Sequence, residues 1–205
     1  IDRLNTKFKK FLSNEDDKKD FDKNLLTINK QIKQIENLVN EFSDFARMPK
    51  PLFKKTNLVA LINDNIHLMK ELDDNLKINL KSNNTQINIM CDSEQINRAF
   101  VNLLKNSIES INENKSKNPD ILKKIDIEIN EKDDYIETYI TDNGIGFDKK
   151  NIKNILKPYF TTKKNGTGLG LPIVNKIIND HNGNLNILSH KNGAKIKINL
   201  PKNVH

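Results

Sequence analysis

The sequence has 205 residues, of which 36% are hydrophobic and 30% charged, with a formal net charge of +7. This length allows one or two domains, and the lack of any apolar run of about 18 residues predicts no transmembrane segment. Lysines are spread through nearly every segment, so the charge forms no basic face and disfavours nucleic-acid binding. The single cysteine, Cys91, cannot form an internal disulfide, and we expect a packed thiol in a cytoplasmic protein. We expect no signal peptide, and the start at Ile1 rather than methionine suggests a piece of a longer protein.

Segment 20–47 is predicted to be a long helix, because its apolar residues recur at steps of three and four. They form a heptad seam of Leu25, Ile28, Ile32, Ile35, Val39, Phe42 and Ala46, widened by Leu38 and Phe45. Apolar residues between Ile1 and Ser13 predict a shorter helix, and 14–17 a polar turn. Because short connections make adjacent helices antiparallel, we expect a helical hairpin.

The two predicted helices differ in length, at about 40 Å and about 20 Å for a rise of ~1.5 Å per residue. About a dozen residues of the longer helix would then expose their seam. We interpret the hairpin as half of a four-helix bundle completed by a second copy, which makes the protein a homodimer; the alternative is a monomeric hairpin packed on the neighbouring domain. Pro49 and Pro51 end the helix. The expected division is therefore a hairpin at 1–48, a linker at 49–56 and a second domain at 57–203.

The second domain is predicted to be α+β, a two-layer α/β sandwich with a mixed sheet. Thr56 or Asn57 should cap a helix that ends near Leu72. Asp92 with Gln95 should form a capping box for the next helix, at 93–113. Short strands are expected at 77–80, 87–90, 124–130, 135–141, 184–189 and 194–200, the last two joined as a hairpin.

Two stretches between these elements are predicted to be irregular. Residues 112–120 are polar and are expected to form a loop. The segment between Phe147 and Gly166 has only a short helical patch at 149–156. A loop of this length inside a compact domain indicates a lid.

Five of the seven glycines fall in two short runs, 144–146 and 166–170. Glycine permits positive φ and lets a ligand approach the backbone closely. The second run leads into an apolar-periodic helix at 169–181, with Pro172 in its first turn. The free N–H groups and positive dipole end of such a helix start form a phosphate cradle. An ordinary glycine-rich loop is the alternative.

Asp142 follows the strand 135–141, in which every second residue is expected to be buried. An ionised carboxylate only accepts hydrogen bonds. At the end of a strand it therefore suits the exocyclic amino group of adenine and repels the carbonyl that guanine carries there. The alternative for 142–144 is a simple turn, which Asp, Asn and Gly favour.

The helix at 93–113 carries two stripes. Its packed stripe is Ile96, Ala99, Phe100, Leu103 and Ser107. Beside it, Asn102, Asn106 and Glu109 form a polar stripe at steps of four and three. Asparagine has low helix propensity and its amide oxygen suits Mg²⁺, so the two asparagines indicate a site for a cation and phosphates. A solvated face is the alternative.

In this order and spacing, four motifs resemble those of the ATP-binding domain of sensor histidine kinases, within the group that includes Hsp90, gyrase B and MutL. Residues 102–107 resemble its N box, 142–146 its G1 box, 159–163 its F box and 166–171 its G2 box. The stretch 41–49 resembles a helix end of nitrogen-regulation (NtrY-like) sensor kinases. The hairpin resembles their dimerisation and histidine-phosphotransfer region.

The resemblance implies ATP and Mg²⁺ as cofactors. Asn106 would bind Mg²⁺, Asp142 would recognise adenine, and Lys105 and Lys163 would approach phosphates. The catalytic residues that it implies are Asn102, Lys105 and Asn106. The implied nucleotide-binding residues are Asn102, Asn106, Asp142, Gly144, Gly146, Phe160, Thr162, Lys163, Gly166, Thr167, Gly168, Leu169 and Gly170.

The resemblance also separates kinases from ATP hydrolases. Hydrolytic relatives place a general-base Glu one helical turn before the Mg²⁺ asparagine, where this sequence has Asn102, which cannot take a proton. We therefore predict a histidine kinase fragment that transfers the γ-phosphoryl group rather than releasing it to water. Glu109 is not expected to substitute. The alternatives are an ATP-gated conformational module or hydrolase of the Hsp90 and MutL type, and a serine protein kinase of the same fold.

None of the four histidines is expected to accept the phosphoryl group, because none precedes an acidic residue. His67 is expected to be partly buried in its helix, and His181 to be a cation at a helix C-terminus. His190 lies in a hairpin turn, and His205 ends the sequence. The resemblance places the acceptor upstream of Ile1 and implies a response-regulator receiver domain as a partner.

Overall fold

The computed structural model describes Phe8 and residues 14–148, 150–163, 166–188 and 190–203. They form two compact units, one up to Met48 and one from Pro49 onward, with Lys163 grouped in the first. No helix within these described ranges is long and apolar enough to cross a membrane.

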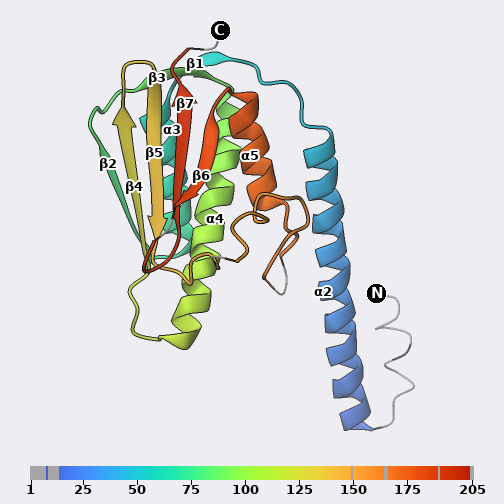
Figure 1. Cartoon of the computed structure of the whole chain (residues 1–205). Coiled ribbons are helices and arrows are strands. Elements are labelled where there is room, and N and C mark those ends of the chain that lie inside the picture. The colour runs from blue at the N-terminus through green and yellow to red at the C-terminus, as the bar shows by residue number, and fades with distance from the viewer. Residues whose placement is uncertain (1–7, 9–13, 149, 164–165, 189, 204–205) are drawn as a thin grey trace. The chain divides into compact units, whose positions relative to one another are not determined.

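The first unit is built on one long helix, α2 (Glu15–Ala46), the blue helix in Figure 1. Asn14 caps this helix, and its side-chain oxygen accepts the N–H of Asp16 at 3.0 Å. The first turn is acidic, which favours the positive end of the helix dipole. The predicted polar turn at 14–17 is therefore wrong, because these residues cap and begin the helix. The predicted shorter helix at 1–13 lies outside the described residues, except for Phe8.

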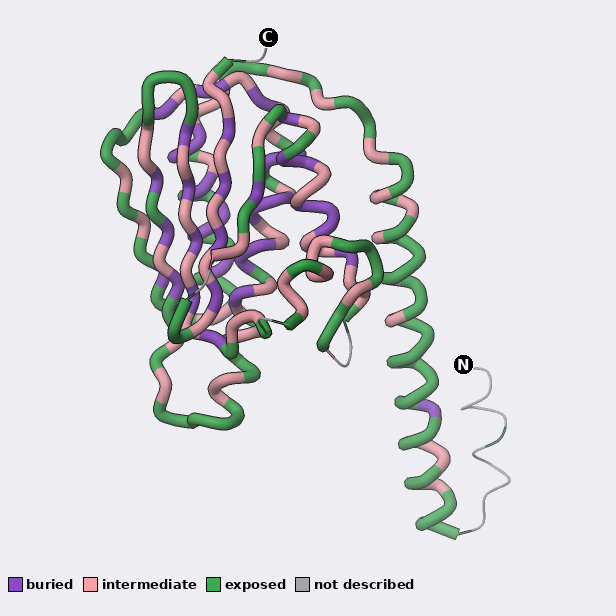
Figure 2. Tube along the Cα trace, viewed as in Figure 1, coloured by how far each residue is buried: buried purple, intermediate pink, exposed green. Residues whose placement is uncertain are grey.

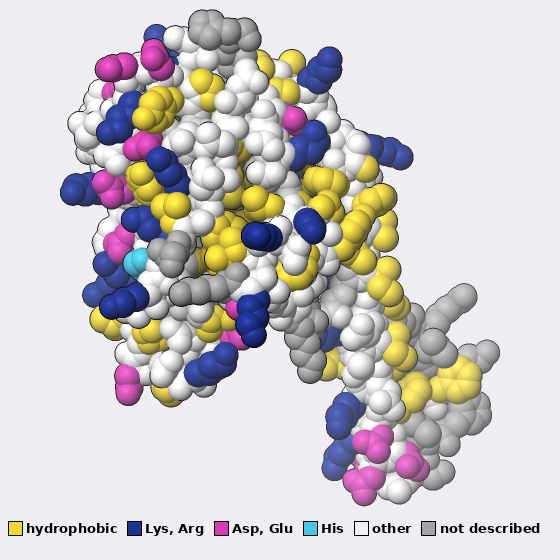
Figure 3. Space-filling view, viewed as in Figure 1, with side chains coloured by type: hydrophobic (Ala, Val, Ile, Leu, Met, Phe, Trp, Pro, Cys, Tyr) yellow, Lys and Arg dark blue, Asp and Glu magenta, His cyan; other side chains and the backbone are white. Residues whose placement is uncertain are grey.

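The apolar seam of α2 lies at the surface of the described chain. Leu25 is buried, whereas the exposed fractions of the seam residues after it are 48% for Ile28, 51% for Ile32, 59% for Ile35, 57% for Val39 and 48% for Phe42. Figure 2 shows α2 as largely exposed, and Figure 3 shows hydrophobic side chains along its surface. A contiguous apolar stripe of this kind is typical of an interaction surface.

The second unit contains a five-stranded mixed sheet in the order β2-β4-β5-β7-β6. Its strands are β2 (Lys77–Ser82), β4 (Lys124–Glu131), β5 (Tyr135–Asp142), β6 (Asn184–Leu188) and β7 (Lys195–Pro201). β2 and β4 are parallel, and the other neighbours are antiparallel. A separate antiparallel pair joins β1 (Lys54–Asn57) to β3 (Asn88–Cys91).

Three helices cover one face of the five-stranded sheet (Figure 1). They are α3 (Leu58–Leu72), α4 (Ser93–Lys117) and α5 (Gly170–Asp180). Buried residues line the space between sheet and helices (Figure 2), and they include Ile125, Ile127 and Ile129 of β4 and the whole predicted packed stripe of α4. The predicted two-layer sandwich with a mixed sheet is confirmed.

The start of α4 anchors the segment that enters the second unit. Asn57 caps α3 and Asp92 caps α4, each by accepting first-turn N–H groups as predicted. Gln95 departs from the capping-box prediction, because its Nε2 donates to the carbonyl of Pro49 at 3.0 Å. The Asp92 carboxylate also accepts the N–H of Leu52 at 2.9 Å. The expected linker is thus partly structured here, and β1 forms within it.

Two element boundaries differ from the prediction. α4 continues to Lys117, through residues that were expected to form a loop. Residues 150–157 form successive turns rather than the helical patch at 149–156, of which Lys149 lies outside the described residues. Asp148 accepts the N–H of Lys150 on its side chain at 3.0 Å and the N–H of Asn151 on its carbonyl at 2.9 Å. These bonds close separate turns that do not continue into a regular helix.

Two histidines differ from their predicted states. His67 is exposed on α3 rather than partly buried. His181, after α5, is 2% exposed; its Nε2 accepts the N–H of Asp92 at 3.0 Å, and its Nδ1 lies 2.8 Å from the carbonyl oxygen of Ile177. A ring nitrogen that accepts carries no proton, so Nδ1 donates and the ring is neutral, not the predicted cation. The ring also meets Phe53 edge-on, with centroids 5.3 Å apart.

We expect His181→Ala to lower the free energy of unfolding by about 2–3 kcal/mol, because it removes buried packing and leaves the N–H of Asp92 without its acceptor. His67→Ala makes the same substitution at an exposed position and should change this free energy by about 0.5 kcal/mol at most. Urea unfolding followed by circular dichroism measures both. Equal effects in the two variants would contradict the structural role of His181.

Candidate functional site

Asp142, the last residue of β5, is a buried carboxylate with 5% of its surface exposed. Its Oδ1 accepts two backbone N–H groups, from Gly144 at 2.9 Å and from Ala194 at 3.1 Å. Burial raises the pKa of the Asp142 carboxyl, although these bonds and one from the side chain of Ser107 act to lower it. Backbone donors from two segments therefore fix the orientation of a carboxylate that has little contact with water.

Close packing of glycines places the loop that follows Asp142. A Cβ on Gly144 would overlap both the side chain and the backbone of Ser110. Gly146 has a φ of +74°, and its Cβ would lie 2.5 Å from the carbonyl oxygen of Gly193. Gly193 itself has a φ of +109°, and its Cβ would overlap the last carbonyl of β5. Only glycine fits these positions, so the loop 142–146 lies packed between α4 and the turn before β7.

The polar stripe of α4 meets the start of α5. Asn102 and Asn106 are half-buried, whereas Lys105 and Glu109 are exposed. A Cβ on Gly170 would lie 3.4 Å from Nδ2 and 3.8 Å from Oδ1 of Asn106. The amide of Asn106 thus lies against the first residue of α5, in agreement with the adjacent course of the two helices in Figure 1.

The start of α5 has the features of an anion site. Leu169 is the N-cap residue, and no side-chain hydrogen bond caps the first turn. Before it, Gly166 is exposed and Thr167 is half-buried, with the Thr167 hydroxyl 3.3 Å from the N–H of Leu169 as its acceptor. Gly168 has a φ of +69°, and its Cβ would lie 2.6 Å from the carbonyl carbon of Tyr159. A glycine-rich turn that leads into a helix without a side-chain cap suits phosphate.

Tyr159 and Phe160 fold back onto this glycine-rich turn. The N–H of Tyr159 donates to the carbonyl of Gly168 at 3.1 Å, and Tyr159 has a φ of +66°, which is uncommon outside glycine. Phe160 is half-buried, and Thr162 is exposed. Lys163 groups with the first unit, so its approach to phosphate stays a prediction.

Sequence reasoning missed part of the surroundings of Asp142. Ser107 was expected only to pack in the core, yet its side chain donates to the Asp142 carboxylate. Gly193 and Ala194 were expected only to form a hairpin turn and the strand after it. The position of the turn beside β5 depends on the pairing of β5 with β7, which local sequence does not show.

The chemistry of these groups fits a magnesium nucleotide. Among the described residues, no group of three or more His, Cys, Asp or Glu side chains could hold a metal ion. Mg²⁺ commonly binds through one or two protein oxygens together with substrate phosphates and water. The amide oxygen of Asn106, beside the phosphate-suited start of α5, is a ligand of that kind.

Residues 91–204 match the family model of histidine kinase-, DNA gyrase B- and HSP90-like ATPases, and the chain belongs to this family. It is 39% identical over 191 residues to a putative sensor histidine kinase NtrY-like of Rickettsia prowazekii, covering 93% of this chain and 31% of the relative. It is 32% identical over 203 residues to the nitrogen regulation protein NtrY of Azorhizobium caulinodans, covering 97% of this chain and 26% of the relative. The chain thus spans less than a third of the length of these relatives.

Solved structures agree with this family. The catalytic domain of the histidine kinase ThkA is similar with a TM-score of 0.66 and 27% identity, covering 74% of this chain and 97% of that domain. The structure of ThkA in complex with the response regulator protein TrrA has a TM-score of 0.75 at 24% identity, and the match covers 96% of this chain and 55% of that one. At this identity the similarity shows the fold alone. The family inferred from the four sequence motifs is confirmed, and the ligand class of such a domain is a nucleotide.

We expect Asp142→Asn to weaken ATP binding roughly ten- to a hundred-fold. An amide N–H group would face the amino group of adenine, and a charged hydrogen bond contributes about 1.5–3 kcal/mol. The Asn side chain can still accept the N–H groups of Gly144 and Ala194, so the fold should persist. Isothermal titration calorimetry measures the affinity, and unchanged ATP binding would contradict the role of Asp142 in recognising the base.

The same variant tests the burial of the charge. Because the folded-state pKa of Asp142 is raised, the folded protein penalises ionisation, and native stability falls relative to the variant as pH rises through that pKa. At lower pH the native side chain is neutral, and the difference is smallest. The free energy of unfolding of Asp142→Asn minus that of the native chain should therefore increase between about pH 4 and about pH 7.

Proposed function

We propose that this chain is the catalytic part of a dimeric sensor histidine kinase. It binds Mg-ATP and transfers the γ-phosphoryl group to a histidine outside this stretch, from which the group passes to an aspartate of a response regulator. The observation that carries the proposal is the buried, backbone-fixed Asp142 in the same unit as Asn106 and the start of α5. A carboxylate that recognises a base and a helix end that suits phosphate match the two ends of ATP. The kinase would act in the cytoplasm, as part of a longer sensor protein.

Each group has a distinct role in this proposal. Asp142 accepts a hydrogen bond from the amino group of adenine, which guanine cannot donate at that position. The N–H groups at the start of α5 and the glycine-rich turn before it bind the phosphates. Asn106 supplies an amide oxygen to Mg²⁺, and the bound ion neutralises phosphate charge. Lys105, exposed one residue before Asn106, adds positive charge near the phosphates.

The choice between transfer and hydrolysis rests on Asn102. Water attacks a phosphoryl group slowly unless a base or another group positions it. Asn102 lies one turn before Asn106 and has no basic group, and Glu109 is exposed on a later turn. The γ-phosphoryl group is therefore transferred to a nucleophile that is better positioned than water, which we propose is a histidine side chain. An ATP-gated module of the Hsp90 and MutL type is the alternative, and measurable steady hydrolysis would favour it.

The histidines of the described residues make poor phosphoryl acceptors. His181 is buried with both ring nitrogens engaged, so it is inaccessible to a γ-phosphate. His67 is exposed on α3, and His190 is exposed beside the turn before β7. Neither precedes an acidic residue, and His205 lies outside the described residues. These observations support an acceptor on a part of the longer protein that this stretch does not include.

The apolar stripe of α2 supports a homodimer. Its residues Ile28 to Phe42 are about half exposed and lie on one side of the helix, as in the seam of a helical bundle. A second copy that brings the same stripe would bury both. ThkA is similar in fold and was solved with a response regulator protein, which supports a receiver domain as the second partner.

A transfer assay tests the proposed reaction. The native chain should bind ATP, release phosphate very slowly and carry no label itself; a longer chain with the upstream histidine segment should gain acid-labile phosphate. Asn106→Ala should abolish this labelling by removing a Mg²⁺ ligand, whereas Asn112→Ala, an exposed asparagine on the same helix, should not. Asn102→Glu should raise phosphate release if the carboxylate holds a water. Steady phosphate release by the native chain would overturn the kinase assignment.

The proposed dimer can be tested by placing a charged residue in the apolar stripe of α2. Ile35→Lys places an ammonium group in the proposed seam, where burial without a partner is costly, so the dimer should dissociate in analytical ultracentrifugation. Leu26→Lys is the matched control, because Leu26 is 73% exposed on the opposite side of α2. A longer chain with the upstream segment that stays monomeric at all concentrations would contradict the bundle.

A further inference from the structure

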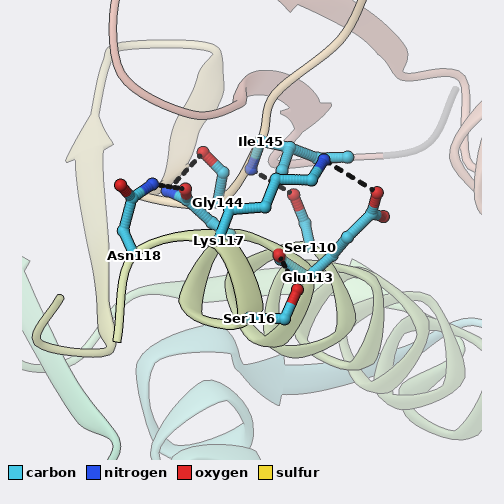
Figure 4. Close-up of polar contacts among 8 residues, drawn as sticks. Ser110, Glu113, Ser116, Lys117, Asn118, Gly144 and Ile145 are labelled. Atoms are coloured by element: carbon cyan, nitrogen blue, oxygen red, sulfur yellow. Dashed lines mark hydrogen bonds and ion pairs between the residues drawn. The ribbon is translucent and has the colours of Figure 1, made fainter. Parts of the chain in front are cut away.

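The last turns of α4 make polar contacts to the loop 142–146, beyond the residues of the four motifs (Figure 4). Nδ2 of Asn114 donates to the carbonyl of Asn143 at 2.9 Å and lies 3.3 Å from the carbonyl of Gly144. Oδ1 of Asn114 accepts from Nδ2 of Asn118 at 2.9 Å. The last contact fixes which end of the Asn114 amide faces the loop.

One turn earlier on α4, Ser110 holds the next residue of the loop. Its hydroxyl oxygen accepts the N–H of Ile145 at 3.1 Å, and its carbonyl lies 3.3 Å from the same N–H. Figure 4 shows Ser110 directly beneath this part of the loop. Gly144 lies so close to Ser110 that a Cβ could not be accommodated. These contacts therefore fix the distance between the loop and α4.

Ser107, Ser110 and Asn114 follow one another at steps of three and four, so they share one face of the helix. Each contacts a different part of the same segment. Ser107 contacts the Asp142 carboxylate, Ser110 accepts the N–H of Ile145, and Asn114 donates to the carbonyls between them. The opposite side of the loop is also held. Asn143 accepts the N–H of Lys124 at 3.0 Å.

We infer that Ser110 and Asn114 are positioning residues for base recognition. They hold the loop 142–146 so that the Asp142 carboxylate meets the amino group of the base while the phosphates lie at the start of α5. This inference rests on the proposed binding of ATP and adds residues that none of the four motifs contains. Because α4 also carries Asn106, a single rigid helix sets the distance between base recognition and phosphate binding.

The test compares two triphosphates that differ only in the recognised group. Purine riboside triphosphate lacks the amino group of ATP, so the ratio of the two affinities reports the hydrogen bond to Asp142 and not phosphate binding. We expect Asn114→Ala to weaken ATP binding about tenfold, through the loss of two loop contacts, and to change the affinity of the analogue less than about twofold. Ser110→Ala should act in the same direction. Isothermal titration calorimetry measures the affinity of the native chain and of each variant for both triphosphates.

Ser116→Ala is the matched control. The Ser116 hydroxyl donates to the carbonyl of Glu113 in its own helix at 2.6 Å, so the same substitution leaves the loop unaffected (Figure 4). If Asn114→Ala does not fold, Asn118→Ala serves in its place, because it removes only the side-chain bond that orients Asn114. It should reduce the preference for ATP over purine riboside triphosphate, but less than the tenfold expected for Asn114→Ala.

Three outcomes would count against the inference. Equal losses for both triphosphates would assign Asn114 and Ser110 a general structural role. Native affinities in folded variants would assign them no role. A native chain that binds both triphosphates with the same affinity would instead overturn base recognition by Asp142, and with it the proposed function.

Discussion

The buried carboxylate of Asp142 is the constraint on which the rest of the site depends. A carboxylate away from water is costly unless it is hydrogen-bonded, and here the donors are two backbone N–H groups that come from different segments. To bring both N–H groups to one oxygen, the loop after β5 and the turn before β7 must pack so closely that a Cβ atom would not fit between their backbones. Glycine at 146 and 193 permits this approach, and glycine at 144 lets the same loop pack against Ser110 of α4. The geometry around Asp142, where we propose that the base binds, is therefore set by the packing of the chain itself.

α4 relates this carboxylate to the other end of the site. Its N-terminus holds the entering segment through Asp92 and Gln95, its middle places Asn106 against α5, and its last turns hold the loop of Asp142. A helix packed on the core by buried residues from Ile96 to Ile111 is a rigid scaffold. Such a scaffold would preserve the separation between Asp142 and Asn106, the two groups that we propose bind the nucleotide.

Much of this arrangement could be predicted from sequence, because periodicity shows which residues are buried. The strands β4 and β5 and the packed stripe of α4 have strong periodicity and lie where expected. β1 could not be predicted, since its residues Lys54–Asn57 have no apolar alternation and pair only through β3. The neutral state of His181 depends on an N–H distant in sequence, at Asp92. The residues after Asp148 carry a helical spacing yet form only separate turns, which apolar periodicity does not distinguish from a short helix.

We propose that Asp142 is a buried, ionisable acceptor whose charged form a bound nucleotide stabilises. The most direct measurement is a ¹³C NMR titration of the Asp142 carboxyl carbon, in the free protein and with saturating Mg-ATP. The free protein should titrate above the usual range for Asp, because burial raises the pKa. Bound ATP should lower this pKa, since a hydrogen bond from the adenine amino group favours the ionised form. An ordinary pKa in the free protein, or one that ATP leaves unchanged, would contradict this role of Asp142.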